Sequence, residues 1–156
     1  MSVKKTSYIE HLQDIANEFF EETGEGTVST HDIANWAMST GRWEPPNGLI
    51  SRKCREDFAR ALRQEYIHDG NNRPIRVKHA ARIRRDGQQL TLWADIRQAP
   101  RSHMEVAFQQ RREQVVGDCC QLDADITYYN SIHDDDKPIQ MVFDFTDDVE
   151  EARTQD

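Results

Sequence analysis

The chain has 156 residues, of which 37% are hydrophobic and 31% charged, and its formal net charge is −8 at pH 7. This length suits one compact domain, or one domain with an appendage. No apolar run is long enough to span a bilayer, and no apolar segment follows the N-terminal lysines as it would in a signal peptide. The three cysteines are too irregularly spaced for a disulfide framework. We therefore expect a cytoplasmic protein whose thiols are reduced.

Charge is distributed unevenly along the chain. The segment from Arg42 to Arg101 holds 14 Lys/Arg against 7 Asp/Glu, whereas the remaining residues hold 6 Lys/Arg against 21 Asp/Glu. A basic segment between acidic flanks is typical of a surface that meets a polyanion. The alternative is an ordinary solvated surface on which the charges have no partner of their own.

Two helices are predicted at the start of the chain. Residues 7–23 show apolar side chains at helical spacing, and Ser7 and Glu10 form a capping box at the beginning of this stretch. A shorter helix is predicted over residues 30–39, after a capping residue at Ser29 or Thr30. A linker rich in proline and glycine then interrupts regular structure.

The third predicted helix is strongly basic on one side. It covers about residues 51–67, and its apolar side includes Cys54, which we expect to be buried. At 100° per residue the basic side chains fall on the opposite side. These side chains are Arg52, Lys53, Arg60 and Arg63.

A β-hairpin is predicted from Ile75 to Ile96, with Asp86-Gly87 as a two-residue turn. The turn sets the same register as the alternation of apolar and polar residues, so two independent features agree. One face is apolar. It pairs Ile83 with Leu90, Ala81 with Leu92, His79 with Ala94 and Val77 with Ile96. The other face is basic. It pairs Arg84 with Gln89, Arg82 with Thr91, Ala80 with Trp93 and Lys78 with Asp95.

A long helix follows Pro100 and is predicted over residues 103–132, with a capping box at Ser102 and Glu105. Apolar residues repeat along it every seven positions, at Phe108, Val115, Leu122 and Tyr129. Such a stripe favours either a homodimer through residues 103–132 or packing of the helix on its own domain. Both alternatives stay open at this point.

The C-terminal tail is acidic and is not expected to pack well, apart from the apolar segment 139–145. Gln140-Met141-Val142-Phe143-Asp144-Phe145 resembles the short glutamine-plus-hydrophobic peptides that dock on bacterial sliding clamps. The resemblance implies a protein partner for Gln140, Met141, Phe143 and Phe145. The alternative is an apolar clip that folds back on the domain or on a second subunit.

The order of helix, helix, helix, hairpin and long helix resembles the winged helix-turn-helix superfamily over residues 7–98. The linker between the second and third helices is longer than in a compact helix-turn-helix. We therefore expect an α+β, mostly helical chain. Residues 1–98 would form a winged-helix domain of three helices and a hairpin wing, residues 99–133 a long C-terminal helix, and residues 134–156 an acidic tail.

This resemblance implies duplex DNA binding and a role in transcription regulation. The third helix would enter the major groove, and the wing would contact the phosphate backbone or a minor groove. The expected DNA-binding residues are Arg52, Lys53, Arg60, Arg63, Arg82, Arg84 and Arg85. Two alternatives use the same fold: a protein-interaction module, and a replication or DNA-processing accessory factor that uses its tail as a tether.

Catalysis is not expected. The chain contains no glycine-rich phosphate loop, nucleophile elbow or zinc-protease motif. Cys119, Cys120 and the histidines around them match no standard zinc spacing. We therefore predict neither an enzyme nor a bound metal or cofactor.

Overall fold

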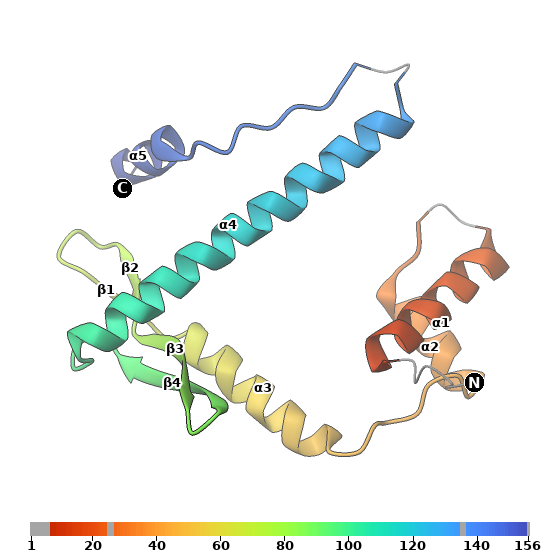
Figure 1. The fold of residues 1–156 in the computed structure, drawn as a ribbon, viewed down its shortest axis with the longest axis horizontal. Helices are drawn as coiled ribbons and strands as arrows, with labels where there is room; N and C mark the ends of the chain where they lie inside the picture. Colours follow the sequence, from red (N-terminus) through yellow and green to blue (C-terminus); the bar gives the residue numbers. More distant parts are fainter. Residues whose placement is uncertain (1–6, 25–26, 135–136, 156) are drawn as a thin grey trace. The chain divides into compact units, whose positions relative to one another are not determined.

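The computed structural model describes residues 7–24, 27–134 and 137–155. It is an α+β structure, mostly helical, and Figure 1 traces its elements along the chain. Contacts divide the chain into two units, Met1–Lys53 and Cys54–Asp156, so that the boundary lies within the third helix. The elements are α1 (Tyr8–Thr23), α2 (Thr30–Ser39), α3 (Leu49–Arg63), β1 (Tyr66–His68), β2 (Pro74–Arg76), β3 (Lys78–Arg85), β4 (Gln88–Asp95), α4 (Arg101–Ile132) and α5 (Thr146–Thr154).

The first unit is built on α1 and α2, whose predicted limits are confirmed. Both hydrogen bonds of the capping box are present, from Glu10 N to Ser7 Oγ and from Ser7 N to the Glu10 carboxylate. The apolar faces of the two helices meet where Phe19 and Trp36 pack edge to face, with ring centroids 5.4 Å apart. Arg42 covers the other side of this contact, 4.2 Å from the Trp36 ring, and is paired with Glu18.

After the end of α3, the second unit contains a hairpin that the sequence did not predict. Helix α3 ends at Arg63 rather than near residue 67, because Tyr66 and Ile67 pair with Arg76 and Ile75 as strands β1 and β2. A turn over residues 69–72 joins the two strands. Asp69 closes it by accepting hydrogen bonds from the backbone N–H of Asn71 and of Arg73, and these bonds hold the pKa of its carboxyl below the usual value.

The second hairpin confirms the predicted register from the pair Lys78–Asp95 to the pair Arg84–Gln89, whereas Val77 and Ile96 lie just outside the strands. Strands β3 and β4 pair Ile83 with Leu90, Ala81 with Leu92 and Lys78 with Asp95. Asp86 and Gly87 both have positive φ, as the two-residue turn requires. Strand β3 begins at Lys78 rather than at Ile75, because the preceding residues belong to β2. Val77 joins the two hairpins: its N–H bonds to Glu65 O, its carbonyl accepts from Ile96 N, and its side chain is fully buried.

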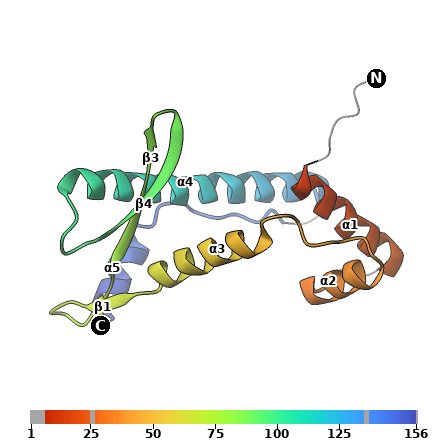
Figure 2. The ribbon, with the colours of Figure 1, turned by 90° about the horizontal axis from the view of Figure 1, so that it is seen from below.

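Helix α4 packs across β3 through its first turns. Ala107 is buried there, and the Phe108 ring lies edge to face with His79 at 5.3 Å. Figure 2 shows the β3–β4 hairpin crossing α4, with its turn on one side of the helix and α3 on the other. The predicted cap at Ser102 is wrong, because the helix begins at Arg101 and its N-cap is Pro100, which makes no side-chain bond.

The described part of the tail, residues 137–155, contacts the rest of the chain. Asn130 binds the backbone of Ile139 through both its amide groups, at 2.8 and 3.0 Å, and the chain then runs back along α4 to α5. Helix α5 was not predicted, although Asp147 and Asp148 in its first turn suit the positive end of a helix dipole. It lies against Arg73 and Pro74, at the start of β2.

The predicted burial of Cys54 is wrong, since its side chain is exposed.

Candidate nucleic-acid interface

Basic side chains from four elements converge in the second unit around a cavity of about 510 Å³. We call this cavity the basic cleft. The cationic residues that line it are Arg63 from α3, Arg76 from β2, Lys78 and Arg82 from β3, and Arg111 from α4. Glu113 is the acidic residue in its lining. A concave surface with this excess of one charge concentrates the electrostatic potential and attracts anions.

The strand period explains why β3 contributes to the cleft. Val77, His79 and Ala81 face the interior, so Lys78 and Arg82 point to the opposite face of the hairpin. Gln110 of α4 fixes Arg82 in place by pairing with its backbone. The Gln110 Oε1 accepts from Arg82 N at 2.8 Å, and the Gln110 Nε2 donates to Arg82 O at 2.7 Å. These two bonds satisfy the backbone N–H and carbonyl of Arg82 on the edge of β3, and they hold α4 next to the cleft.

Lys78 is partly neutralised by two carboxylates. Its Nζ lies 3.2 Å from Asp95 Oδ2, as the sequence predicted, and 3.4 Å from Glu65 Oε2. The hydrogen bond to Asp95 is the main reason why the pKa of Lys78 is raised. Asp95 also binds Arg97 through both oxygens, and chiefly for this reason the pKa of Asp95 lies far below its usual value.

The remaining cleft cations are not in ion pairs with any described residue. Within the described part of the chain, no ion pair forms at Arg63, Arg76, Arg82 or Arg111. The Arg63 guanidinium lies 5.4 Å from the centre of the Trp93 ring, and Arg76 Nε donates to the hydroxyl of Tyr66 at 3.3 Å. Neither contact removes positive charge, so these guanidinium groups stay available to an anion.

The surroundings of His79 are also positive. Burial is the first cause that lowers the pKa of this imidazole, and the charges of Arg111, Arg76 and His103 lower it further. The Nε2 atom bonds to Arg76 O at 2.9 Å, which opposes the shift. The lowered pKa favours the neutral imidazole; His79 lines the cleft and supports α4 through Phe108.

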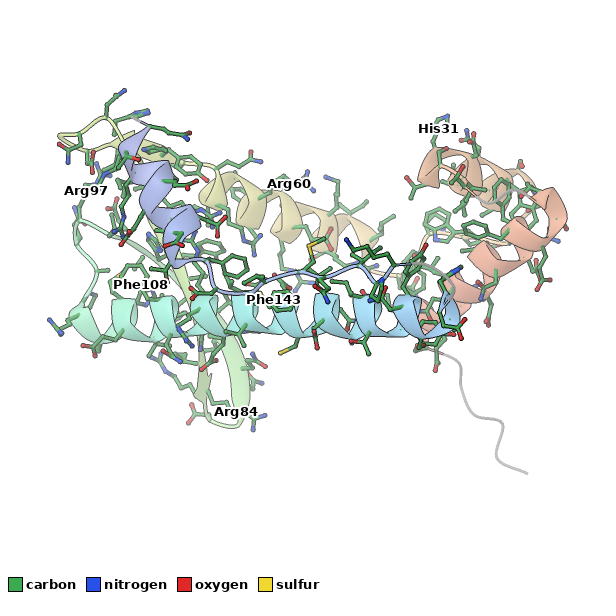
Figure 3. All side chains as sticks on the ribbon, turned by 90° about the horizontal axis from the view of Figure 1, so that it is seen from above. His31, Arg60, Arg84, Arg97, Phe108 and Phe143 are labelled. Atoms are coloured by element: carbon green, nitrogen blue, oxygen red, sulfur yellow. The ribbon has the colours of Figure 1, made fainter. Side chains whose placement is uncertain are left out.

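The structure brings some of the predicted DNA-binding residues together. Arg63 and Arg82 line the basic cleft, and Arg60 lines an adjoining hollow of about 610 Å³ together with Arg63 and Arg76. Arg84 and Arg85 lie at the hairpin turn and line neither cavity. Figure 3 shows Arg84 and Arg60 on opposite sides of α4.

Arg52 and Lys53 belong to the first unit, whereas the basic cleft belongs to the second. The Arg52 guanidinium lies 5.9 Å from the centre of the Tyr8 ring. The Tyr8 hydroxyl in turn accepts a hydrogen bond of 2.9 Å from the indole of Trp43. Arg52 therefore has a structural contact in its own unit.

Sequence reasoning missed Arg111, Trp93 and Arg76 as members of the cleft. Arg111 lies in the long helix, which was predicted either to form a homodimer or to pack on its own domain. Nothing in the sequence indicates that Arg111 lies close to β3. Trp93 was placed on the basic face of the hairpin, as the structure has it, but not as a contact of Arg63. Arg76 was not among the predicted DNA-binding residues, although it lines both cavities.

The predicted partner residues of the tail lie on the extended segment before α5. Met141 is 57% exposed and Phe145 44%, whereas Phe143 is half-buried beside α4 (Figure 3). Gln140 is exposed. Of the three apolar residues in this set, Met141 and Phe145 are therefore open to a partner, and Phe143 is partly covered.

Comparison with protein-family models, with curated proteins and with solved structures finds no match to this chain. Among the described residues, no helix combines the length and the apolar character that crossing a membrane requires. Across residues 7–24, 27–134 and 137–155, no group of three His, Cys, Asp or Glu side chains is placed to hold a metal ion.

Proposed function

We propose that this protein binds duplex DNA through the basic cleft, that its first three helices and a hairpin act as a winged helix, and that it regulates transcription in the cytoplasm. The observation that carries the proposal is the convergence of Arg63, Arg76, Arg82 and Arg111 on one cavity without carboxylate partners among the described residues. Guanidinium groups bind phosphate oxygens through paired hydrogen bonds, so a cluster of them suits a phosphate backbone.

Polar neighbours support the same ligand. Thr91, Gln110 and Gln114 line the cleft between the cations, and side-chain hydroxyl and amide groups are common donors to phosphate and sugar oxygens. Such contacts position a duplex without reading its sequence.

The experiment is a binding titration of the full chain against a random duplex, the matching single strand and an RNA duplex, followed by fluorescence anisotropy at 50 and 200 mM salt. We expect the DNA duplex to bind most tightly and to weaken steeply as salt rises. The absence of duplex binding at 50 mM salt would overturn the proposal. Equal, salt-insensitive binding of all three nucleic acids would overturn it as well.

A second candidate function is protein binding by the tail. The observation that favours it is the exposure of Met141 and of Val142, at 57% and 80%, beside a helix that leaves them uncovered. The tail would then tether the protein to a partner such as a replication or DNA-processing assembly. Gln140→Ala with Phe143→Ala should abolish that contact in a pull-down with a purified sliding clamp while leaving duplex affinity unchanged. Retention of the clamp by this variant would exclude the tether.

A further inference from the structure

An arginine lies over a tryptophan ring in each unit of the chain, and the two pairs differ in their carboxylates. In the first unit Arg42 lies 4.2 Å from the centre of the Trp36 ring and is also paired with Glu18 at 2.7 Å. In the second unit Arg63 lies 5.4 Å from the centre of the Trp93 ring, and no described carboxylate pairs with it. The charge of Arg42 is therefore offset within its own unit, whereas that of Arg63 is not.

The register of the β3–β4 hairpin brings Trp93 into the basic cleft. Trp93 pairs with Ala80 across the hairpin, and both residues line the cleft. Because the side chain of Ala80 is a single methyl group, the indole has room to lie across the strand pair. Arg63 reaches the ring from the last turn of α3, where the helix dipole favours a cation. The contact therefore joins the end of a helix to the outer face of a hairpin.

An indole holds a guanidinium group without neutralising it. The face of the ring attracts a cation, and the indole has no acceptor atom that would take up an N–H donor. Lys78, by contrast, is held by two carboxylates that offset its charge, and Arg76 uses its Nε–H on the Tyr66 hydroxyl. Arg63 therefore keeps both its charge and its N–H donors for a ligand.

The position of Arg63 matters because two hollows meet there. Arg63 and Arg76 line both the basic cleft and the adjoining hollow, so a phosphate backbone that passes from one to the other meets them. An exposed arginine loses rotamer freedom when a ligand fixes it, and this loss weakens binding. A ring that orients the side chain beforehand reduces the loss.

We propose that Trp93 is a positioning residue for duplex binding, which holds the Arg63 guanidinium at the junction of the basic cleft and the adjoining hollow. This inference rests on the proposed function of the cleft. Trp93 acts through Arg63 and adds no charge of its own. Removing the ring should therefore weaken binding without changing the number of phosphates that the protein neutralises.

The contact is tested first without nucleic acid. The full chain is labelled with 5-fluorotryptophan, and the fluorine resonance of Trp93 is identified by its loss in Trp93→Phe. Arg63→Ala should move this resonance. The matched control is Arg60→Ala, three residues earlier on α3 and 3.8 Å from Asp57, which should leave the resonance in place. An unmoved Trp93 resonance in Arg63→Ala would overturn the proposal.

The second test measures duplex affinity by fluorescence anisotropy. At 50 mM salt Trp93→Leu should bind about fivefold more weakly than wild type, whereas Trp93→Phe should stay within about twofold, because a phenyl ring still attracts a guanidinium group. The salt slope of Trp93→Leu should equal that of wild type, since Arg63 keeps its charge. Arg63→Ala should lower the slope by about 0.9. Circular dichroism shows whether the variants keep the fold.

A third test separates positioning from a general effect on the fold. Trp93→Leu should cause no further loss of affinity in the Arg63→Ala background, and an equal loss there would overturn the proposal. Arg63→Lys changes only an exposed side chain and keeps its charge without the planar group, so it should also bind about fivefold more weakly. Wild-type affinity in Trp93→Leu or Arg63→Lys would overturn the role of Trp93 and leave DNA binding standing. Absence of duplex binding by the wild-type chain would overturn both.

Discussion

Salt dependence gives the sharpest prediction about the cleft. Four arginines line it without a carboxylate partner in the described part of the chain: Arg63, Arg76, Arg82 and Arg111. If each neutralises one phosphate, the logarithm of the binding constant should fall with the logarithm of salt at a slope of about −3.6. Between 50 and 200 mM salt the affinity for duplex DNA should then drop about 150-fold.

Removing two of these arginines should halve the slope. In Arg63→Ala with Arg82→Ala two phosphate contacts remain, so the slope becomes about −1.8 and the same change of salt costs about 12-fold. The control is Arg73→Ala with Arg101→Ala, which changes the net charge equally. Both control arginines are paired within their own segment, Arg73 with Asp69 at 2.8 Å and Arg101 with Glu105 at 2.7 Å.

The assay is fluorescence anisotropy with a labelled duplex at four or more salt concentrations, with the two double variants measured in parallel. The control should keep the wild-type slope. If the two variants lose the same amount of slope, net charge alone explains the binding and the cleft has no special role. A wild-type slope in Arg63→Ala with Arg82→Ala would place the phosphate contacts elsewhere.

Three further predictions concern the surroundings of the cleft. Asp95→Asn removes one of the two carboxylates that pair with Lys78 and leaves Glu65, so duplex affinity should rise at 50 mM salt and the slope should steepen by less than about 0.9; weaker binding would contradict this role of the ion pair. Gln110→Ala leaves both backbone groups of Arg82 without their partner, which should lower the free energy of unfolding by about 1–2 kcal/mol in urea, while Gln109→Ala, an exposed neighbour, changes little. The pKa of His79 is lowered in the folded state, so below about pH 6.5 the unfolded chain takes up a proton that the folded chain does not, and stability should fall as pH falls from 7.5 to 5.5. His79→Gln should reduce that fall, and an identical pH dependence in the variant would show that another group is responsible.

The β3–β4 hairpin is the part of the fold that the sequence predicts best. The Asp86-Gly87 turn and the alternation of residues specify one register independently, and a shift by one residue would bring the arginines to the buried face. Strands β1 and β2 escaped prediction because each has only three residues, too few for a period of two to be visible.

The cleft itself could be predicted only in part. Arg63 and Arg82 were identified from charge on a helix face and on a strand face, which are local properties. The contribution of Arg111 depends on how α4 crosses β3, and that crossing is set by Gln110, Ala107 and Phe108 packing on the hairpin. Contacts between residues this far apart in the chain leave no periodic signal in the sequence.

The most direct measurement is photo-cross-linking of the full chain to a duplex that carries a photoreactive thymine analogue, with the attached peptides identified by mass spectrometry. Cross-links should map to residues 76–82 and 91–93, which hold the strand side of the basic cleft. They should disappear in Arg63→Ala with Arg82→Ala at 200 mM salt. Cross-links confined to other parts of the chain, under conditions where the duplex is saturated, would contradict DNA binding through the cleft.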